Sequence, residues 1–219
     1  MLYQEVQKIF TSLGSSLANL SANLDTTITI AVTTYVAARW LSPRISDFCE
    51  QHPDTTVRFV HNVNTELFDI TDVDIAIRWG KCGEPEPHRV HEIPMPLFAC
   101  AKPALIRNHC ASREMTDLGN LTLLCEDRTE DLWREWTDPQ TSIEGCARRT
   151  IEDANVRVQA AVDGMGLILA DDMMQFELQA GLLERFGDRN LPGYGYTLLR
   201  NPLTAKRPLV NELVFDIIR

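Results

Sequence analysis

Residues 27–59, together with the run 72–80, constrain the fold of this chain most strongly. Residues 27–32 alternate and then become continuously apolar, and their β-branched side chains favour a strand. Thr33 and Thr34 can cap the helix that follows, whose buried side comes from residues 36–41. After a second strand, residues 74–79 are apolar on both faces, which is typical of a strand buried in a parallel sheet. This order predicts the opening of a parallel α/β sheet.

The rest of the chain continues to alternate between strands and helices. Further strands are predicted at 55–60, 89–93, 97–101, 121–125, 148–151, 167–170 and 194–200, and helices at 66–70, 104–108, 130–136, 155–163, 173–180 and 210–218. Residues 181–186 are predicted to form a turn into another strand. Gly164 and Gly166 are expected to end one of these helices, because glycine adopts the left-handed backbone conformation at the lowest energetic cost. Alternation implies right-handed parallel crossovers, and therefore doubly wound, Rossmann-like α/β lobes.

Two such lobes fit the length of the chain. We expect the first lobe to comprise residues 26–100 and 198–219, and the second to comprise 101–197. The chain would then cross between lobes near 97–101 and near 197–201, which makes a two-strand hinge.

An apolar stripe recurs every three or four residues before the first strand. It predicts an amphipathic helix over residues 1–25, formed by Leu2, Val6, Ile9, Leu13, Leu17, Leu20 and Leu24. At 1.5 Å per residue the helix would reach about 36 Å, longer than packing within a small domain requires. We expect it to pair with another chain. Folding back onto its own lobe remains the alternative.

Charge and composition exclude several classes of protein. A formal net charge of −10 argues against DNA binding by this chain alone, because DNA binders usually present a basic surface. The N-terminus lacks the pattern of a secretory signal and no apolar run approaches a membrane span, so we expect a cytoplasmic location. The scattered cysteines are expected to be reduced, with Cys100 and Cys125 in the core and Cys82 either reactive or inert.

Catalytic and metal-binding patterns are weak. The histidines show no ligand spacing, and the sequence contains no nucleophile elbow, phosphate-binding loop or dinucleotide fingerprint. We therefore expect no metal, no cofactor and no enzymatic activity.

Ligand binding has more support, because ligands of open α/β sheets settle beyond the carboxyl ends of the strands. The residues predicted to line such a site are Thr33, Thr34, Tyr35, His61, Asn62, Arg78, Trp79, Asp127, Asp153 and Asn155. Hydroxyls and helix N-terminal amides could hold a carboxylate, with Arg78 as its ion-pair partner and Trp79 as an apolar wall. The alternatives are structural: helix caps for the threonines and Asp153, and an ion pair of Arg78 with Asp72 or Asp74. The acidic groups Glu126, Asp127, Glu152 and Asp153 could instead favour a ligand that carries an amine.

Four ordered blocks of sequence resemble one known family. The blocks are AARWLSPRISDFCEQHPDTTVRF, DVDIAIRWG, PLFACAKPALI and VQAAVDGMGLILAD. They resemble the effector-binding domain of LysR-type transcriptional regulators, most closely the branch around the glycine-cleavage and β-lactamase-operon activators. The resemblance implies the fold of type 2 periplasmic binding proteins, preceded by a linker helix that pairs subunits. It departs at Tyr35, where that branch often has a small hydroxyl residue.

The resemblance also implies a function and its partners. We expect a ligand-sensing domain that binds a small metabolite, such as an amino acid, peptide or carboxylate, between its lobes. It would act as a homodimer or homotetramer and reach promoter DNA through an N-terminal domain that this sequence does not include. The alternatives are a solute-binding receptor of a transport system and an enzyme on the same fold.

Overall fold

A computed structural model describes residues 26–61, 68–109, 115–126, 131–137 and 141–219. The helix predicted over residues 1–25 lies outside these residues, and its pairing with another chain stays a prediction.

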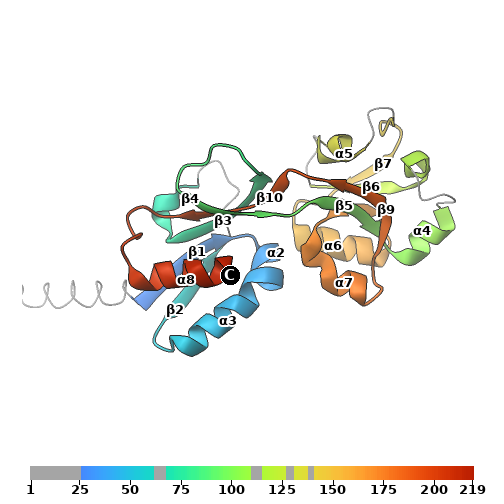
Figure 1. Cartoon of the computed structure of the whole chain (residues 1–219). Coiled ribbons are helices and arrows are strands. Elements are labelled where there is room, and N and C mark those ends of the chain that lie inside the picture. Colours follow the sequence, from blue (N-terminus) through green and yellow to red (C-terminus); the bar gives the residue numbers. More distant parts are fainter. Residues whose placement is uncertain (1–25, 62–67, 110–114, 127–130, 138–140) are drawn as a thin grey trace, which may run out of the picture.

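Two five-stranded sheets organise the described residues into two lobes (Figure 1). The first sheet has the strand order β2-β1-β3-β10-β4. Its strands are β1 (Thr27–Val32), β2 (Thr56–Val60), β3 (Ile75–Lys81), β4 (Arg89–Pro94) and β10 (Tyr194–Arg200). The helices of this lobe are α2 (Thr34–Val36), a π-helical turn (Ala37–Leu41), α3 (Ser42–Gln51) and α8 (Pro208–Ile218), with a 3-10 turn at Ile70–Asp72. Helices α3 and α8 pack against each other.

The second sheet has the strand order β7-β6-β8-β5-β9. Its strands are β5 (Leu97–Ala101), β6 (Thr122–Cys125), β7 (Ala147–Thr150), β8 (Leu167–Ala170) and β9 (Glu184–Leu191). Its helices are α4 (Pro103–His109), α5 (Asp131–Trp136), α6 (Ala154–Asp163) and α7 (Gln175–Gln179), with 3-10 turns at Met115–Asn120 and Asp172–Met174. The two-lobed α/β architecture predicted from the sequence is confirmed.

Both sheets are mixed rather than wholly parallel. Strand β1 pairs in parallel with β2 and β3, and β6 pairs in parallel with β7 and β8. Strand β10 runs antiparallel to β3 and β4, and β5 runs antiparallel to β8 and β9. Each of these two antiparallel strands directly follows a passage from the other lobe. Each of the two therefore enters its sheet at the carboxyl ends of the parallel strands and runs in the opposite direction.

The crossings between lobes lie earlier in the chain than the sequence suggested. Residues 97–101 are fully within the second sheet and wholly buried, and residues 194–200 are within the first. The chain therefore passes between lobes at residues 95–96 and 192–193, where Pro96, Pro192 and Gly193 interrupt the strands. The two passages are joined by a 2.9 Å hydrogen bond from the Met95 amide to the Tyr194 carbonyl.

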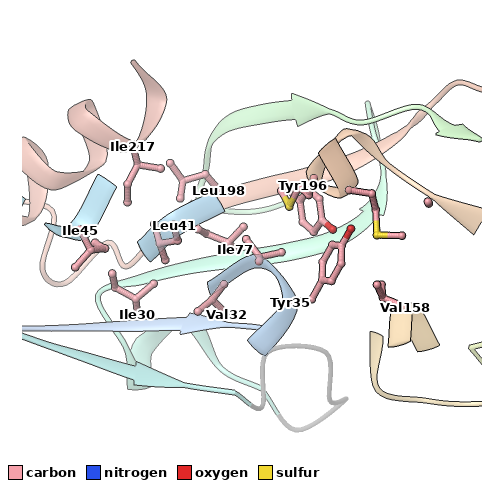
Figure 2. Packing of buried hydrophobic residues seen from close by; sticks show 14 of the residues in the cluster. Ile30, Val32, Tyr35, Leu41, Ile45, Ile77, Val158, Tyr196, Leu198 and Ile217 are labelled. Carbon is pink, nitrogen blue, oxygen red and sulfur yellow. The ribbon is translucent and has the colours of Figure 1, made fainter. Parts of the chain in front are cut away.

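One apolar core runs through the first lobe and reaches the second. Ile30, Ile77 and Leu198 belong to it, and so does Val158 on α6 of the other lobe (Figure 2). A separate core lies within the second lobe around the edge-to-face pair Trp133 and Trp136. The continuity of the first core shows that the lobes are closed on one another.

The cysteines agree in part with expectation. Those at positions 49, 82, 100, 125 and 146 form no disulfide, and Cys100 and Cys125 are buried as predicted. Burial raises the pKa of the Cys82 thiol, and nearby Glu92 adds to this effect. A thiol of this kind is a poor nucleophile at neutral pH.

Candidate functional site

A cavity of about 690 Å³ lies between the two lobes. The first lobe contributes residues from the ends of β1, β3 and β10, and the second contributes residues from the ends of β6 and β8 and from the start of α6. This is the position that the strand-end rule for open α/β sheets predicts. We refer to this cavity as the interlobe cleft.

Local structure at the end of β1 brings three predicted residues to the cleft. The Thr33 hydroxyl oxygen accepts a 3.4 Å hydrogen bond from the Val36 amide, so Thr33 is a helix cap as well as a lining residue. Thr34 is exposed on the cleft wall and Tyr35 is buried. The π-helical turn that follows precedes Pro43, and a widened turn relieves the clash that proline makes with the carbonyl four residues before it.

Asp171 lines the cleft and is the centre of a hydrogen-bond network between the lobes. It follows β8 directly, is 4% exposed, and accepts hydrogen bonds from Tyr35 (2.9 Å to Oδ1) and Tyr196 (3.0 Å to Oδ2). The Met173 amide adds a third hydrogen bond of 3.0 Å. Both tyrosines belong to the first lobe and Asp171 belongs to the second, so this carboxylate ties the lobes together. Figure 2 shows the two phenolic oxygens turned toward the same point.

Burial controls the ionisation of these three groups. It raises the pKa of Asp171, while the hydrogen bonds from Tyr35, Met173 and Tyr196 oppose that rise. Burial also raises the pKa of each phenol, and the neighbouring Asp171 carboxylate raises it further. Both phenols therefore stay protonated at neutral pH and act as donors.

Further polar contacts join the two lobes around this centre. Arg39 pairs with the buried Glu177 at 2.7 Å, and the Asn155 amide donates to the Thr34 hydroxyl at 3.1 Å. Lys81 pairs with Glu135 at 3.0 Å. The hydrogen bond from Lys81 lowers the pKa of Glu135, so this pair is ionised at neutral pH.

Aromatic rings form one wall of the cleft. The Trp79 ring stacks on Tyr194 with centroids 5.9 Å apart and lies 4.9 Å from the tilted ring of Tyr196. The register of β3 against β10 places Tyr196 opposite Trp79, which explains this contact.

The structure brings most of the predicted residues together. Those that line the cleft are Thr33, Thr34, Tyr35, His61, Trp79 and Asp153. Asn155 reaches it through its hydrogen bond to Thr34, and His61 is held by a 2.9 Å contact between its Nδ1 and the Val32 carbonyl. Asp153 also caps α6, since its Oδ1 accepts from the Val156 amide at 3.0 Å. Asn62 and Asp127 lie outside the described residues.

Arg78 is placed elsewhere, and the prediction that it faces the cleft is not supported by the geometry. It lies 3.7 Å from Glu86 and lines a different cavity of about 400 Å³. The alternative ion pair with Asp74 is also wrong, because Asp74 pairs instead with Arg207 at 2.8 Å. Successive side chains of a strand point to opposite faces, so a cleft position for Trp79 turns Arg78 away.

Sequence reasoning missed Asp171, Tyr196, Lys81 and Glu135. Asp171 follows a strand whose predicted end was residue 170, and the strand-end rule would have found it. Tyr196 lies inside a strand, and only the pairing of β10 with β3 shows that it faces the cleft.

Within the described residues we find no group of histidine, cysteine and carboxylate side chains able to hold a metal ion. In the same part of the chain no helix combines the length and the apolarity that crossing a membrane requires.

Comparison with curated proteins finds relatives among transcriptional activators. The glycine cleavage system transcriptional activator of Escherichia coli K12 is 27% identical over 187 residues, which cover 83% of this chain and 60% of the relative. The HTH-type transcriptional activator AmpR of Citrobacter koseri is 28% identical over 191 residues, which cover 85% of this chain and 66% of the relative. The chain thus spans about 60% of the length of the first of these relatives.

Solved structures share the fold. The AmpR effector binding domain from Citrobacter freundii aligns with a TM-score of 0.70 at 18% identity, covering 86% of this chain and 94% of that one. The regulatory domain of AphB from Vibrio vulnificus aligns with a TM-score of 0.67 at 20% identity, covering 88% of this chain and 96% of that one.

The family model described as the LysR substrate binding domain matches residues 21–215, nearly the whole chain. Together with the activator relatives, this match identifies the chain as a member of the LysR substrate-binding domain family, the effector-binding part of LysR-type regulators.

Proposed function

We propose that this domain senses a small molecule in the interlobe cleft and passes the signal to a DNA-binding domain outside this chain. The observation that carries the proposal is the Asp171 carboxylate, buried at the cleft and shared by tyrosines of the opposite lobe. Tyr35, Asp171 and Tyr196 all line the cleft, where a bound ligand can contact them. Ligand binding and lobe arrangement are therefore coupled through the same groups.

The physical basis is a shift in populations. A ligand changes the arrangement of the lobes only by as much as its affinity differs between the alternative arrangements. Contacts such as Tyr35 to Asp171 and Arg39 to Glu177 exist only when the lobes are close. A ligand that supplements them stabilises the closed form, and one that competes with them favours a more open form.

The residues proposed to contact the ligand are those that line the cleft or adjoin it, namely Thr33, Thr34, Tyr35, His61, Trp79, Asp153 and Asn155. The polar groups would orient the ligand, and the aromatic wall would cover its apolar part. Binding rather than catalysis is the expected activity.

The assembly around the domain is also a proposal. By analogy with the activators to which it is similar, the domain would work as a homodimer or homotetramer in the cytoplasm, with promoter DNA as the partner of the complete protein. The net charge of −10 supports a separate domain for DNA contact.

The proposal is tested by screening amino acids, short peptides and carboxylates for thermal stabilisation of this chain. Compounds that bind are then followed by small-angle scattering, and by promoter binding of the protein that carries both domains. We expect at least one bound compound to change both the scattering profile and the promoter affinity. Bound compounds that change neither would refute the sensing function.

A further inference from the structure

The charges that line the interlobe cleft point to the chemical class of its ligand. Carboxylates come from both lobes, while the described ammonium and guanidinium groups of the lining are those of Lys81 and Arg157. The carboxylates of the described lining are Glu84, Glu126, Glu135, Glu152, Asp153 and Asp171. The described part of the cleft therefore carries an excess of negative charge.

Both of these basic groups are already engaged. Lys81 pairs with Glu135 at 3.0 Å. The Arg157 guanidinium donates to the carbonyls of Ile151 (2.5 Å) and Glu152 (3.1 Å) and lies 3.7 Å from Glu126. An anionic ligand would have to compete with these partners for the two basic groups.

Two helix N-termini at the cleft are occupied as well. Asp153 places its own carboxylate on the first turn of α6, and the Thr33 hydroxyl caps α2. A second anion beside Asp153 would be repelled by it. By contrast, the side-chain carboxylates of Glu84 and Glu152 have no hydrogen-bond or ion-pair partner among the described residues, and both residues are exposed at the cleft.

The aromatic wall supplies a second, independent feature that favours a cation. Trp79 stacks on Tyr194, and ring faces of this kind attract ammonium groups. The Lys81 ammonium already lies 5.6 Å from the centroid of the Tyr194 ring, so this wall accepts a positive charge in the closed structure.

We propose that the interlobe cleft takes an organic cation, a molecule with a protonated amine beside an aromatic or apolar body. The amine lies near Glu84 and Glu152 at the cleft edge, and the apolar body lies against Trp79. This inference rests on the sensing function proposed above and narrows it to one class of ligand.

Three probes of nearly equal shape test the charge directly: phenethylamine, 2-phenylethanol and 3-phenylpropionate. Each is titrated into the 219-residue chain by calorimetry, up to about 10 mM because affinities of such fragments are weak. We expect phenethylamine to bind at least about fivefold more tightly than the other two, with an affinity that falls as salt is added. Equal or tighter binding of the alcohol or the carboxylate, or no binding of the amine, overturns the proposal.

Two variants test which carboxylates bind the amine group. Glu152→Gln and Glu84→Gln should each weaken phenethylamine binding about three- to fivefold without changing the affinity of the alcohol. Glu50→Gln is the matched control, since it removes the same charge from an exposed position on α3. Equal losses in all three variants would mean that only net charge is sensed, and the site would be rejected.

The two proposals fail in different ways. If the carboxylate probe binds best and alters the scattering profile, the cleft senses a ligand but the cation class is wrong. If phenethylamine binds through Glu152 while every bound compound leaves promoter affinity unchanged, the cation class holds and the sensing function is wrong.

Discussion

The hydrogen bonds that Tyr35 and Tyr196 donate to Asp171 should contribute measurably to the stability of the closed domain. Tyr35→Phe and Tyr196→Phe each remove one hydroxyl and leave the ring in place. Because the acceptor is a carboxylate that is 4% exposed, each change should cost about 1.5–3 kcal/mol of unfolding free energy. In a domain of this size that is a fall in Tm of about 3–12 °C.

Tyr194→Phe is the matched control. The Tyr194 hydroxyl also donates to a carboxylate, Glu135 at 2.8 Å, but the Glu135 side chain is 39% exposed. Water can replace the lost donor there, so we expect a cost of at most about 1 kcal/mol. Urea unfolding followed by tryptophan fluorescence would measure all three variants.

The double variant Tyr35→Phe with Tyr196→Phe separates two explanations. With both donors gone, Asp171 would take up a proton more readily, since burial already raises its pKa. The unfolding free energy that the double variant loses at neutral pH should therefore be smaller than the sum of the losses in the two single variants. Strict additivity, or a control variant that loses as much as Tyr35→Phe, would refute the reasoning that a shared buried carboxylate joins the lobes.

Other changes test separate parts of the structure. Because the pKa of Asp171 is raised, the folded chain still holds a proton that the unfolded chain has released just above the ordinary aspartate pKa of 3.8. The stability of the native chain relative to Asp171→Asn should therefore fall as the pH rises from 3.8 toward neutral. Urea unfolding across this range measures the difference, which would stay constant if the pKa were not raised. Arg207→Ala should cost about 3 kcal/mol, because it removes the 2.8 Å partner of the buried Asp74, and a loss within about 0.5 kcal/mol in chemical denaturation would contradict this. Gly166→Ala should destabilise the chain severely or prevent folding, because a Cβ there would lie 2.3 Å from a backbone carbonyl oxygen of β6. Gly145→Ala is the control, because a Cβ at that position meets nothing within 4 Å. Equal Tm values for the two variants would exclude this steric explanation.

Much of the fold was predictable because its signals are local. The apolar alternation of residues 27–32 and the continuous run 97–101 are strands in the structure. Asp153 begins α6 as a cap, and Gly164 ends it with a φ of 87°, as the composition of these ends indicates. Gly166 was interpreted wrongly as part of that helix end, since its small size is instead required by close packing against β6.

The path of the chain between lobes was less predictable. The sequence predicts that the apolar run 97–101 is part of the hinge, yet its burial on both faces places it inside a sheet. The prolines before it and the pair Pro192–Gly193 were the better signals, since they mark where regular pairing stops.

The residues of the candidate site were also predictable only in part. Thr34 and Tyr35 follow a strand end and could be found from sequence order alone. Arg78 could not be assigned to a face without the register of β3, and Tyr196 could not be placed without its antiparallel pairing. The shared bonds of Asp171 depend on how the lobes close, which no local pattern encodes.

The central claim is that the interlobe cleft is the binding site, and a blocked cleft tests it most directly. Thr34→Trp would fill the cleft from its wall, while Thr56→Trp places the same ring at an exposed position on β2. Calorimetric titration of a compound found in the screen should show binding to the native chain and to Thr56→Trp, with at least about tenfold weaker binding to Thr34→Trp. Equal affinity for all three proteins would contradict the account and move the site elsewhere.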